Sequence, residues 1–322
     1  MALQANLPVV DVGGRSVSER DLSNASRSMD EAFREVGFCY VVNTGVVNGV
    51  VSQAFAASQR FHAQSAEVKQ RVAINEFHRG YMAPKTSLIK TSSVAKVTRP
   101  NLSESLMFMH EVDPSDPAYG APLQGPNQWP EDLPGFRPAI ENYQQEMAAL
   151  AHRIMRIMER ALGLRANYLS PFFEKPTTWL RLLHYPPQPR GDDEQFGAAP
   201  HTDYGFMTLL AQDEVGGLQV RKRSGQWIDA PPLPGAFVLN VADMLARWTN
   251  DRWTSTPHRV VNHSPYDRYS LPFFWDMSMD AEIVCLPTCH DESERTKYQP
   301  VVFGDYVMER LNKNYSYREK LA

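Results

Sequence analysis

Cysteine is scarce in this chain of 322 residues, which contains only Cys39, Cys285 and Cys289. Such an odd and sparse set does not suit a disulfide framework and is typical of proteins in a reducing compartment. Long apolar runs are missing too, since no stretch approaches the roughly 18 consecutive apolar residues of a membrane span. The first residues, MALQANLPVVDVGG, lack the basic and apolar regions of a signal peptide. We therefore expect a soluble, cytoplasmic protein with no membrane partner.

An excess of positive charge is also absent. The 33 Lys and Arg residues are outnumbered by 37 Asp and Glu residues, which gives a formal net charge of -4. A nucleic-acid-binding protein needs a basic patch or stripe, so we expect no nucleic acid among the partners. What the chain does have is a 43% share of hydrophobic residues, which is enough to bury a substantial core.

One long helix dominates the pattern in the middle of the chain. Over residues 136–164, apolar side chains recur at spacings of three and four, which is the period of an amphipathic helix. Pro138 falls in its first turn, where the missing N–H does no harm. A helix of this kind usually lies along the back of a sheet. Weaker patterns predict further helices over residues 20–36 and 303–322.

Short strands account for most of the remaining pattern. Two strand candidates, 7–12 and 37–43, flank the helix predicted at 20–36. About eight more strand candidates lie from Thr178 onward. The eight candidates are 178–185, 206–212, 218–222, 227–230, 236–241, 258–263, 268–275 and 282–286. Closely spaced short strands predict a sandwich or barrel, for which a jelly roll is a natural solution. We expect a mainly β fold with flanking helices, and a surface loop rather than a linker at 114–134.

Two residues of the segment APHTDYG are candidate metal ligands. His201 and Asp203 are two positions apart, and on an extended chain such residues point the same way, so both can converge on one ion. The pair alone is weak evidence, because a surface His near a turn Asp is common. His258 strengthens it, since the intervening strands could return it to the same place. Two His and one carboxylate form a facial triad that leaves adjacent positions on iron(II) open for substrates and O₂.

A second pair with the same spacing follows His258. On a strand, Arg268 and Ser270 face the same way, and a planar guanidinium beside a hydroxyl is suited to binding a carboxylate deep in a barrel. Tyr185 ends the strand candidate WLRLLHY and could offer its hydroxyl to the same acid. His184, one position earlier, should then face away from it.

These residues carry a resemblance to a known family. Between Trp179 and Pro287, the chain is similar in order to the isopenicillin N synthase-like family of 2-oxoglutarate/iron(II)-dependent dioxygenases. The similar stretches are HTDYG, GGLQV, NVADML, TSTPHRVVN and RYSLPFF, with fainter similarity in LPVVDV and AFREVGFCYVVNTGV. The combination of HxD, a distant His and RxS at these intervals is specific. Together the matches span most of the chain.

The resemblance implies a distorted double-stranded β-helix, which is a form of jelly roll, supported by the long helix. It also implies an iron(II) enzyme that uses O₂ and the cosubstrate 2-oxoglutarate and releases succinate and CO₂. Such an enzyme hydroxylates, desaturates or cyclises a small organic molecule. The implied metal ligands are His201, Asp203 and His258, and the implied 2-oxoglutarate contacts are Arg268, Ser270 and Tyr185.

The resemblance further implies that residues 1–322 form a single catalytic domain. Its parts are an N-terminal α/β portion near the substrate (1–135), the long helix (136–164), the jelly-roll core (175–290) and a C-terminal helix (300–322). In this family the N-terminal portion helps to line the substrate pocket. Candidate lining residues are Tyr81, Met107 and Phe108, together with one of Phe274 and Trp275.

The chain departs from the family pattern in two places. Many plant members carry an asparagine two positions before the tyrosine, where this chain has Leu183, and the usual NHG after the N-terminal strand is here Asn43-Thr44-Gly45. Neither departure touches the metal set. The loss of the asparagine removes one contact to 2-oxoglutarate.

Two alternative functions remain open from the sequence. Some relatives keep both motifs yet oxidise their substrate without 2-oxoglutarate, and a barrel of this kind could also serve as a non-catalytic sensor of a small acid. The intact triad favours an enzyme, because a sensor has no need for open positions on iron. Cys285, Cys289 and His290 lack a second pair at zinc-ligand spacing, and basic residues such as Arg79 are expected on a solvated surface. The prime substrate and the oligomeric state are left open.

Overall fold

The computed structural model describes residues 7–188, 194–291, 295–315 and 317–318. Its centre is an eight-stranded sheet in which β1 and β2 run parallel and the other neighbours run antiparallel. In order across this sheet, the strands are β1 (Val9–Asp11), β2 (Phe38–Val42), β10 (Phe237–Val241), β7 (Met207–Gln212), β12 (Arg268–Asp276), β5 (Thr177–Tyr185), β4 (Glu104–Met109) and β3 (Gly80–Met82).

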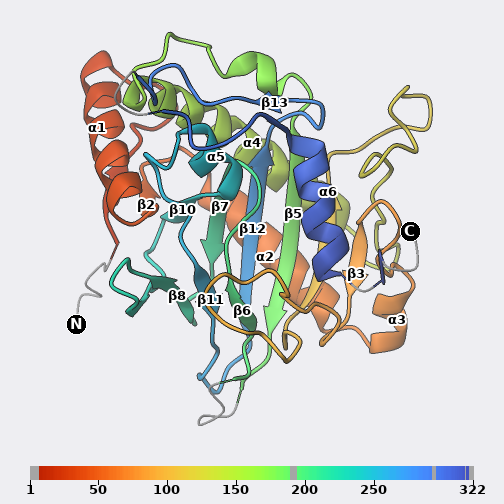
Figure 1. Cartoon of the computed structure of the whole chain (residues 1–322). Helices are drawn as coiled ribbons and strands as arrows, with labels where there is room; N and C mark the ends of the chain where they lie inside the picture. The colour runs from red at the N-terminus through yellow and green to blue at the C-terminus, as the bar shows by residue number, and fades with distance from the viewer. Residues whose placement is uncertain (1–6, 189–193, 292–294, 316, 319–322) are drawn as a thin grey trace.

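Two smaller sheets accompany the large one. The first has four strands, in the order β6 (Ala198–His201), β11 (His258–Val260), β8 (Leu218–Arg221) and β9 (Trp227–Asp229). The second pairs β13 (Glu282–Ile283) with β14 (Val301–Val302). Figure 1 shows the four-stranded sheet in front of the large one.

The α-helices among the described residues cover the back of the large sheet and one side of its front. They are α1 (Glu19–Glu35), α2 (Asn48–His62), α3 (Ala66–Gln70), α4 (Phe136–Ala161), α5 (Asp243–Trp248) and α6 (Phe303–Asn314), and a short 3-10 helix occupies Ser170–Phe173. Helices α1, α2 and α4 lie together behind the sheet, and α6 lies on the opposite side (Figure 1). No helix in the described part of the chain is both long and apolar enough to cross a membrane.

The apolar residues face two separate interiors. One cluster packs the large sheet against the helices behind it. The other lies between the two main sheets and includes Phe38, Leu183 and Val238 from the large sheet and Val220 and Val260 from the small one. Sheets packed face to face in this way form a jelly roll. This is the mainly β fold with flanking helices that the sequence predicts.

Helix α4 supports strand β12 from behind. Its apolar residues recur on one buried face, and two polar side chains join the layers. The Tyr143 hydroxyl donates a hydrogen bond to the carbonyl oxygen of Leu271 (3.3 Å), and the indole N–H of Trp275 points at the sulfur of Met155 (3.0 Å). The helix begins at residue 136 as predicted and ends at Ala161, three residues early.

Three further elements end at least three residues before their predicted last residue. Strand β11 ends at Val260 rather than 263, because its pairing with β6 shifts register between His258 and Val260. The Asn262 side chain then donates to the carbonyl oxygens of Tyr185 (2.9 Å) and Tyr266 (2.8 Å), which fixes a turn. Strand β13 ends at residue 283 and helix α6 at residue 314; of the predicted tail, residues 316 and 319–322 lie outside the described part.

Several elements lack a clear sequence pattern and were not predicted, among them α2, α3, β3, β4, β6 and α5. All six residues of β4 are buried, so the strand shows no alternation of apolar and polar residues. The expectation for Arg79 is wrong. Its guanidinium is fully buried and donates to the carbonyl oxygens of Phe77, His110 and Leu123, which satisfies much of its hydrogen-bonding capacity away from solvent.

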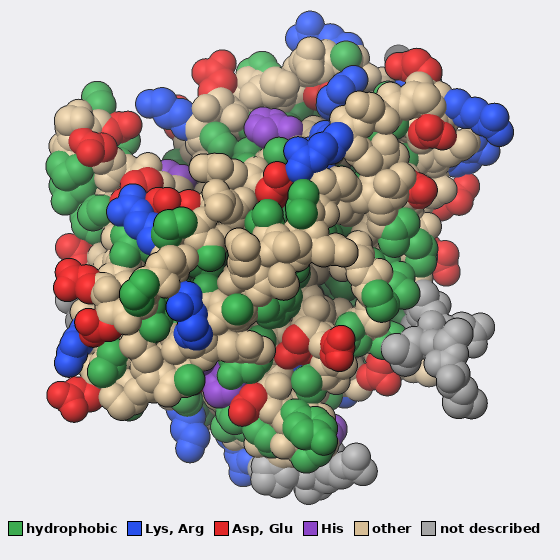
Figure 2. All heavy atoms as spheres, turned by 180° about the vertical axis from the view of Figure 1, so that it is seen from behind, with side chains coloured by type: hydrophobic (Ala, Val, Ile, Leu, Met, Phe, Trp, Pro, Cys, Tyr) green, Lys and Arg blue, Asp and Glu red, His purple; other side chains and the backbone are tan. Residues whose placement is uncertain are grey.

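Charged side chains of both signs are mixed on the surface. Figure 2 shows Lys and Arg interspersed with Asp and Glu over the face opposite to that of Figure 1. On this face, the described residues form no extended patch of one sign. This distribution agrees with the near balance of acidic and basic residues in the sequence.

A network of buried charges lies on the helix-covered face of β4 and β5. The carboxylate of Glu104 accepts hydrogen bonds from Lys69 (2.7 Å), from His184 (2.7 Å) and from the hydroxyl of Tyr81. His184 also contacts Asp267 (3.0 Å). Burial alone would raise the pKa of Glu104, but the bonds from His184, Lys69 and Tyr81 outweigh it and lower the pKa to about 2. His184 thus faces away from Tyr185, as alternation along β5 requires.

Replacing Glu104 by Gln is expected to lower the free energy of unfolding at pH 7 by roughly 3–5 kcal/mol, because Lys69 would be left buried without its counter-charge. The folded-state pKa lies below the ordinary value of 4.5. The carboxylate therefore contributes stability above pH 4.5, and this contribution is lost as the pH falls toward 2. Urea unfolding of both proteins over this pH range measures the difference.

The matched control is Glu141→Gln, which removes a surface pair with Arg137 on α4 (2.7 Å). Exposed pairs contribute roughly 0–1 kcal/mol, so this variant should unfold nearly as the wild type does. An equal, pH-independent loss of stability in both variants would contradict the role assigned to the Glu104 network.

Candidate active site

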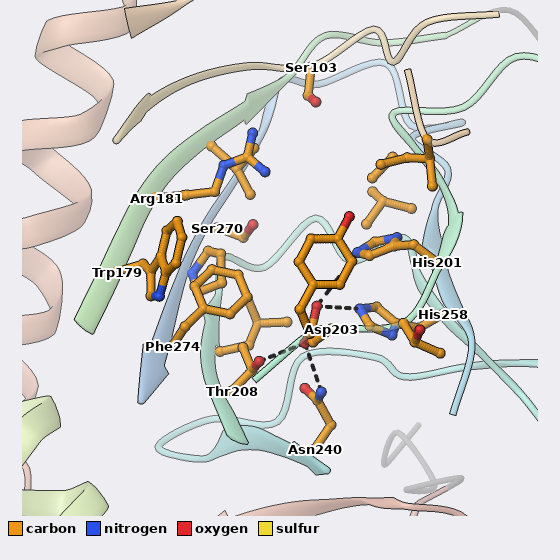
Figure 3. Close-up of a pocket in the computed structure, with 18 of the residues that line it drawn as sticks. Ser103, Trp179, Arg181, His201, Asp203, Thr208, Asn240, His258, Ser270 and Phe274 are labelled. Atoms are coloured by element: carbon orange, nitrogen blue, oxygen red, sulfur yellow. Dashed lines mark hydrogen bonds and ion pairs between the residues drawn. The ribbon is translucent and has the colours of Figure 1, made fainter. Parts of the chain in front are cut away.

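A cavity of about 140 Å³ lies between the large and small sheets, with α6 along one side. At about 30 Å³ for each water molecule, this is room for roughly five of them, which suits small molecules rather than a polymer. Side chains from β5 and β12 form one wall, and residues 201–205 together with His258 form the opposite one (Figure 3). The candidate residues for metal and cosubstrate binding all line this cavity.

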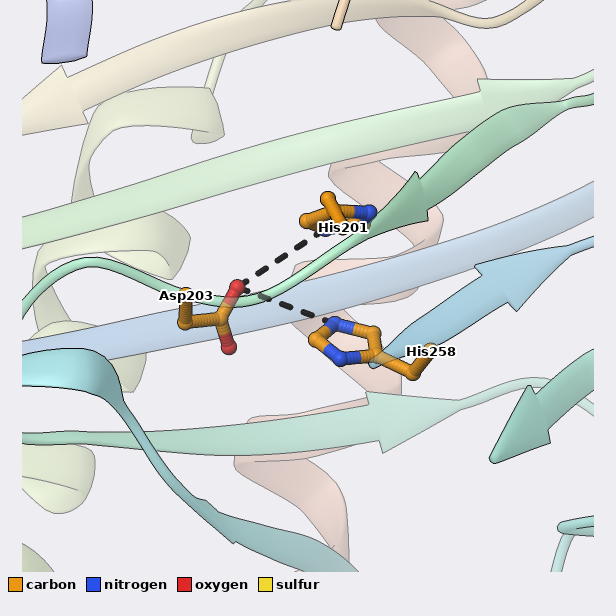
Figure 4. A group of neighbouring side chains, drawn as sticks. All are labelled: His201, Asp203 and His258. Atoms are coloured by element: carbon orange, nitrogen blue, oxygen red, sulfur yellow. Dashed lines mark ion pairs between the residues drawn. The ribbon is translucent and has the colours of Figure 1, made fainter. Parts of the chain in front are cut away.

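The three candidate metal ligands come together at one end of two paired strands. His201 is the last residue of β6 and His258 the first of β11, and the two are directly opposite in the ladder. Asp203 follows in the turn after β6. Its Oδ1 lies 3.8 Å from Nε2 of His201 and 3.7 Å from Nε2 of His258 (Figure 4). Among the described residues, no other three His, Cys, Asp or Glu side chains form a group that could hold a metal, and Cys285, Cys289 and His290 do not.

The neighbours of these side chains orient them for a shared ion. The Nδ1 of His201 faces the carbonyl oxygen of Ala199 (2.7 Å), and the Nδ1 of His258 faces that of Thr256 (3.2 Å). Each Nδ1 therefore carries the proton, which leaves the Nε2 lone pair free toward Asp203. Burial and then the neighbouring His258 lower the pKa of His201 to about 4, so its ring is neutral at pH 7, as metal binding requires.

Asp203 presents a single oxygen to the two imidazoles. Its other oxygen, Oδ2, accepts hydrogen bonds from the hydroxyl of Thr208 (2.6 Å) and the side-chain amide of Asn240 (2.8 Å). Burial would raise the pKa of Asp203, but the adjacent imidazoles and these two bonds lower it, so the group is a carboxylate at neutral pH. One carboxylate oxygen and two imidazole nitrogens are a donor set that suits iron(II) and leaves further positions open toward the cavity.

Arg268 forms the second polar end of the cavity and is fully buried. It donates to the Gln212 side chain (3.1 Å) and more weakly to the Ser270 hydroxyl (3.4 Å), and it stacks over the ring of Tyr185, 4.6 Å from the centroid. Its Nε has no hydrogen-bond partner, and in the described part of the chain no carboxylate lies within ion-pair distance. Asp213 is close enough to interact electrostatically with Arg268 but forms no ion pair with it. A buried cation without a direct counter-ion is costly, so this end of the cavity suits an anion.

Two family models match the chain. Residues 164–276 match the 2OG-Fe(II) oxygenase superfamily, and residues 7–132 match the model described as the non-haem dioxygenase in morphine synthesis N-terminal region. A 2-oxoglutarate-Fe(II) type oxidoreductase hxnY of Emericella nidulans is 35% identical, over 89% of this chain and 84% of the relative. The chain belongs to the family of 2-oxoglutarate/iron(II)-dependent oxygenases.

Other members of the family agree along most of their length. The homoarginine-6-hydroxylase 2-ODD-233 of Oryza sativa is 32% identical, covering 93% of this oxygenase and 92% of the relative. A full-length Neurospora crassa protein, solved in complex with alpha-KG and thymine, superposes with a TM-score of 0.83 at 32% identity, covering 95% and 96% of the two chains. The resemblance stated from the sequence is confirmed, and iron(II), 2-oxoglutarate and O₂ are the cofactor and cosubstrates of this family.

The structure corrects the expected substrate-pocket residues. Met107 lines the cavity, but Tyr81 and Phe108 do not. Phe108 follows Met107 on β4, so it points to the other face and stacks on Trp129. On β12, Phe274 lines the cavity, whereas Trp275 faces the helices behind the sheet.

Sequence reasoning missed four polar residues of the oxygenase site, namely Gln212, Thr208, Asn240 and Arg181. Thr208 and Asn240 are opposite each other on the paired strands β7 and β10, a contact that no local pattern reveals. Leu183, which replaces the family asparagine, faces the cavity opposite Ser270 and offers no hydrogen bond there.

Replacing Asn240 by Leu is expected to weaken iron(II) binding roughly 10- to 100-fold, because Asp203 would lose a donor that fixes its orientation. Anaerobic competition with a metal-sensitive chelating dye measures the affinity. Gln219→Leu serves as a matched control, since this amide bonds to the exposed Asp229 at the rim of the small sheet (2.9 Å). Equal iron affinity in wild type and Asn240→Leu would contradict the orienting role.

Proposed function

We propose that this oxygenase holds iron(II) through His201, Asp203 and His258. The observation that carries the proposal is the convergence of Oδ1 of Asp203 with both Nε2 atoms at one end of the cavity. Because Thr208 and Asn240 occupy Oδ2, Asp203 binds through one oxygen only. This single bond keeps the cavity-facing positions of the ion open for the cosubstrates.

We assign 2-oxoglutarate binding to Arg268, Ser270 and Tyr185. The far carboxylate of the cosubstrate supplies the counter-charge that the buried guanidinium lacks, and the Ser270 hydroxyl adds a second donor on the same side of β12. The ring of Tyr185 packs against the guanidinium, and we assign its hydroxyl a contact to the acid. With leucine at position 183, Gln212 is the further polar residue that orients Arg268.

When bound, iron(II) and 2-oxoglutarate supply the oxidising chemistry, in which O₂ is consumed, succinate and CO₂ are released and a small organic molecule is oxidised. The protein contributes position and enclosure. Burial keeps the ring of His201 neutral by lowering its pKa, and the apolar walls from Leu183, Trp179 and Phe274 limit water at the reacting centre.

We also propose that residues 1–322 act as one catalytic domain. Strands from the N-terminal portion complete both edges of the large sheet, with β1 and β2 at one side and β3 and β4 at the other. Met107 of β4 lines the same cavity as the metal group. This interleaving supports a single unit in which the portion 1–135 borders the substrate region beside the core 175–290.

The decisive experiment is an anaerobic titration of metal-free protein with iron(II) and 2-oxoglutarate. An iron–keto-acid chelate gives a weak visible charge-transfer band. We expect the band in wild type, its loss in Asp203→Ala, which removes a ligand, and at least a roughly tenfold higher 2-oxoglutarate requirement in Arg268→Gln. The control is Arg156→Gln, an exposed arginine on α4.

Three outcomes would count against these roles. Iron binding without a band in wild type would favour the oxidase chemistry that dispenses with 2-oxoglutarate. Tight binding of a small acid without iron would favour a sensor. A full band in Asp203→Ala would show that the metal is held elsewhere.

A further inference from the structure

Arg181 is a second cation that lines the oxygenase cavity. It lies on β5 between Trp179 and Leu183, and these residues share the cavity-facing side of the strand with Tyr185. In Figure 3, the Arg181 side chain extends from β5 into the cavity, across from His201 and Asp203. Tyr185 is opposite Arg268, so Arg181 lies four positions further along, roughly 13 Å from that pair.

The hydrogen-bonding capacity of Arg181 is only partly used by the protein. One Nη donates to the Ser105 hydroxyl (2.9 Å). The Nε is buried without a hydrogen-bond partner, and no carboxylate among the described residues lies within ion-pair distance of this guanidinium. By contrast, Lys69 pairs with Glu104, and Arg79, although its Nε also lacks a partner, donates to three carbonyl oxygens. Arg181 is therefore a partly buried charge with donor capacity left for a molecule in the cavity.

When iron(II) and 2-oxoglutarate are bound, the other charged groups at the site balance one another, and Arg181 is left without a counter-charge. Iron(II), the Asp203 carboxylate, the 2-oxoglutarate dianion and the Arg268 guanidinium together carry no net charge. Among the described residues that line the cavity, the remaining carboxyl group is Asp276, whose Oδ1 accepts a hydrogen bond from the backbone N–H of Phe206 (2.7 Å). Burial, and then the nearby Asp203 carboxylate, raise the pKa of Asp276. No ion pair between Asp276 and Arg181 is present in the described part of the chain, so an anionic group of the prime substrate can supply the counter-charge of Arg181.

Apolar side chains form much of the wall near Arg181, beside polar lining residues such as His78 and Ser103. Met107 is its cross-strand neighbour on β4, and Phe274 is opposite Trp179 on β12. Val307 and Leu311 of α6 line the same cavity. Such walls bury an aromatic or aliphatic body and leave Arg181 to fix one acidic end of the molecule.

We propose that the prime substrate is a small monocarboxylic acid with an apolar, ring-sized body, and that Arg181 is the specificity-determining residue that binds its carboxylate. Trp179 and Phe274 hold the body so that the end away from the carboxylate faces the metal group. This inference rests on the proposed function, because it assumes that Arg268 is already occupied by 2-oxoglutarate.

The test uses the protein loaded with iron(II) and 2-oxoglutarate under anaerobic conditions. The probes are phenylacetate, cinnamate and 1-naphthoate, each beside its primary amide, which keeps the shape but lacks the charge. Isothermal titration calorimetry measures binding. We expect wild type to bind at least one acid more tightly than its amide, and Arg181→Gln to weaken that acid roughly 10- to 100-fold while the amide is unaffected. Arg181→Lys should recover part of the acid preference.

The controls distinguish the role of Arg181 from the proposed iron and 2-oxoglutarate binding on which it rests. The charge-transfer band should keep its intensity and its 2-oxoglutarate requirement in Arg181→Gln, which also shows that the variant is folded, whereas Arg268→Gln should lose 2-oxoglutarate. If the band is normal, three results would each overturn the role of Arg181 alone. These are amides bound as tightly as acids, no acid bound at all, and an acid preference that stays intact in Arg181→Gln. A higher 2-oxoglutarate requirement in Arg181→Gln would overturn it too, since Arg181 would then bind the cosubstrate. Absence of the band in wild type would overturn both proposals.

Discussion

The antiparallel pairing of β5 with β12 is the constraint on which the rest of the oxygenase depends. Across this ladder Tyr185 is opposite Arg268, Leu183 is opposite Ser270 and Trp179 is opposite Phe274. Because side chains alternate between the two faces of a strand, the register alone decides which of them reach the cavity. A slip of one residue would carry every cavity-facing side chain to the helix-covered face. The packing of α4 behind β12 and the bonds from Asn262 to the end of β5 hold that register.

Buried charged side chains differ in their hydrogen-bond partners between the two faces of this ladder. On the helix-covered face, Glu104 accepts bonds from Lys69, Tyr81 and His184, and the network is closed within the protein. On the cavity face, Arg268 and Arg181 each keep a buried Nε without a partner. An unpaired buried charge costs stability, and a bound anion removes that cost. The closed network stabilises the strands. The two arginines that lack hydrogen-bond partners make the stability of the protein depend on its ligands.

Much of this arrangement could be predicted from the sequence where it rests on local spacing. The i, i+2 pairs His201–Asp203 and Arg268–Ser270 depend only on extended backbone, and the strand candidates of the core fall within a few residues of the observed ones. Contacts between distant segments could not be predicted. Thr208 and Asn240 meet because β7 pairs with β10, and β4, buried on both faces, has no periodicity to reveal it. Arg181 is a different case: once Tyr185 is assigned to the cavity, steps of two along WLRLLHY lead to Leu183, Arg181 and Trp179.

The position of Arg181 explains how one scaffold can serve different substrates. The pairing of β6 with β11 fixes the proposed metal ligands, and the pairing of β5 with β12 fixes the residues to which we assign 2-oxoglutarate binding. Neither depends on the side chain at position 181, which lies in the middle of β5, close to α6 and β4. A substitution there changes the charge offered to the substrate without changing the backbone that holds the reacting groups. Relatives at 32% identity include one named as a homoarginine-6-hydroxylase and one solved with thymine, so the family combines one scaffold with different small molecules. Substrate choice is separable from the oxidation chemistry because the substrate-binding residue, Arg181, and the proposed 2-oxoglutarate contact, Tyr185, lie at different positions of the same strand.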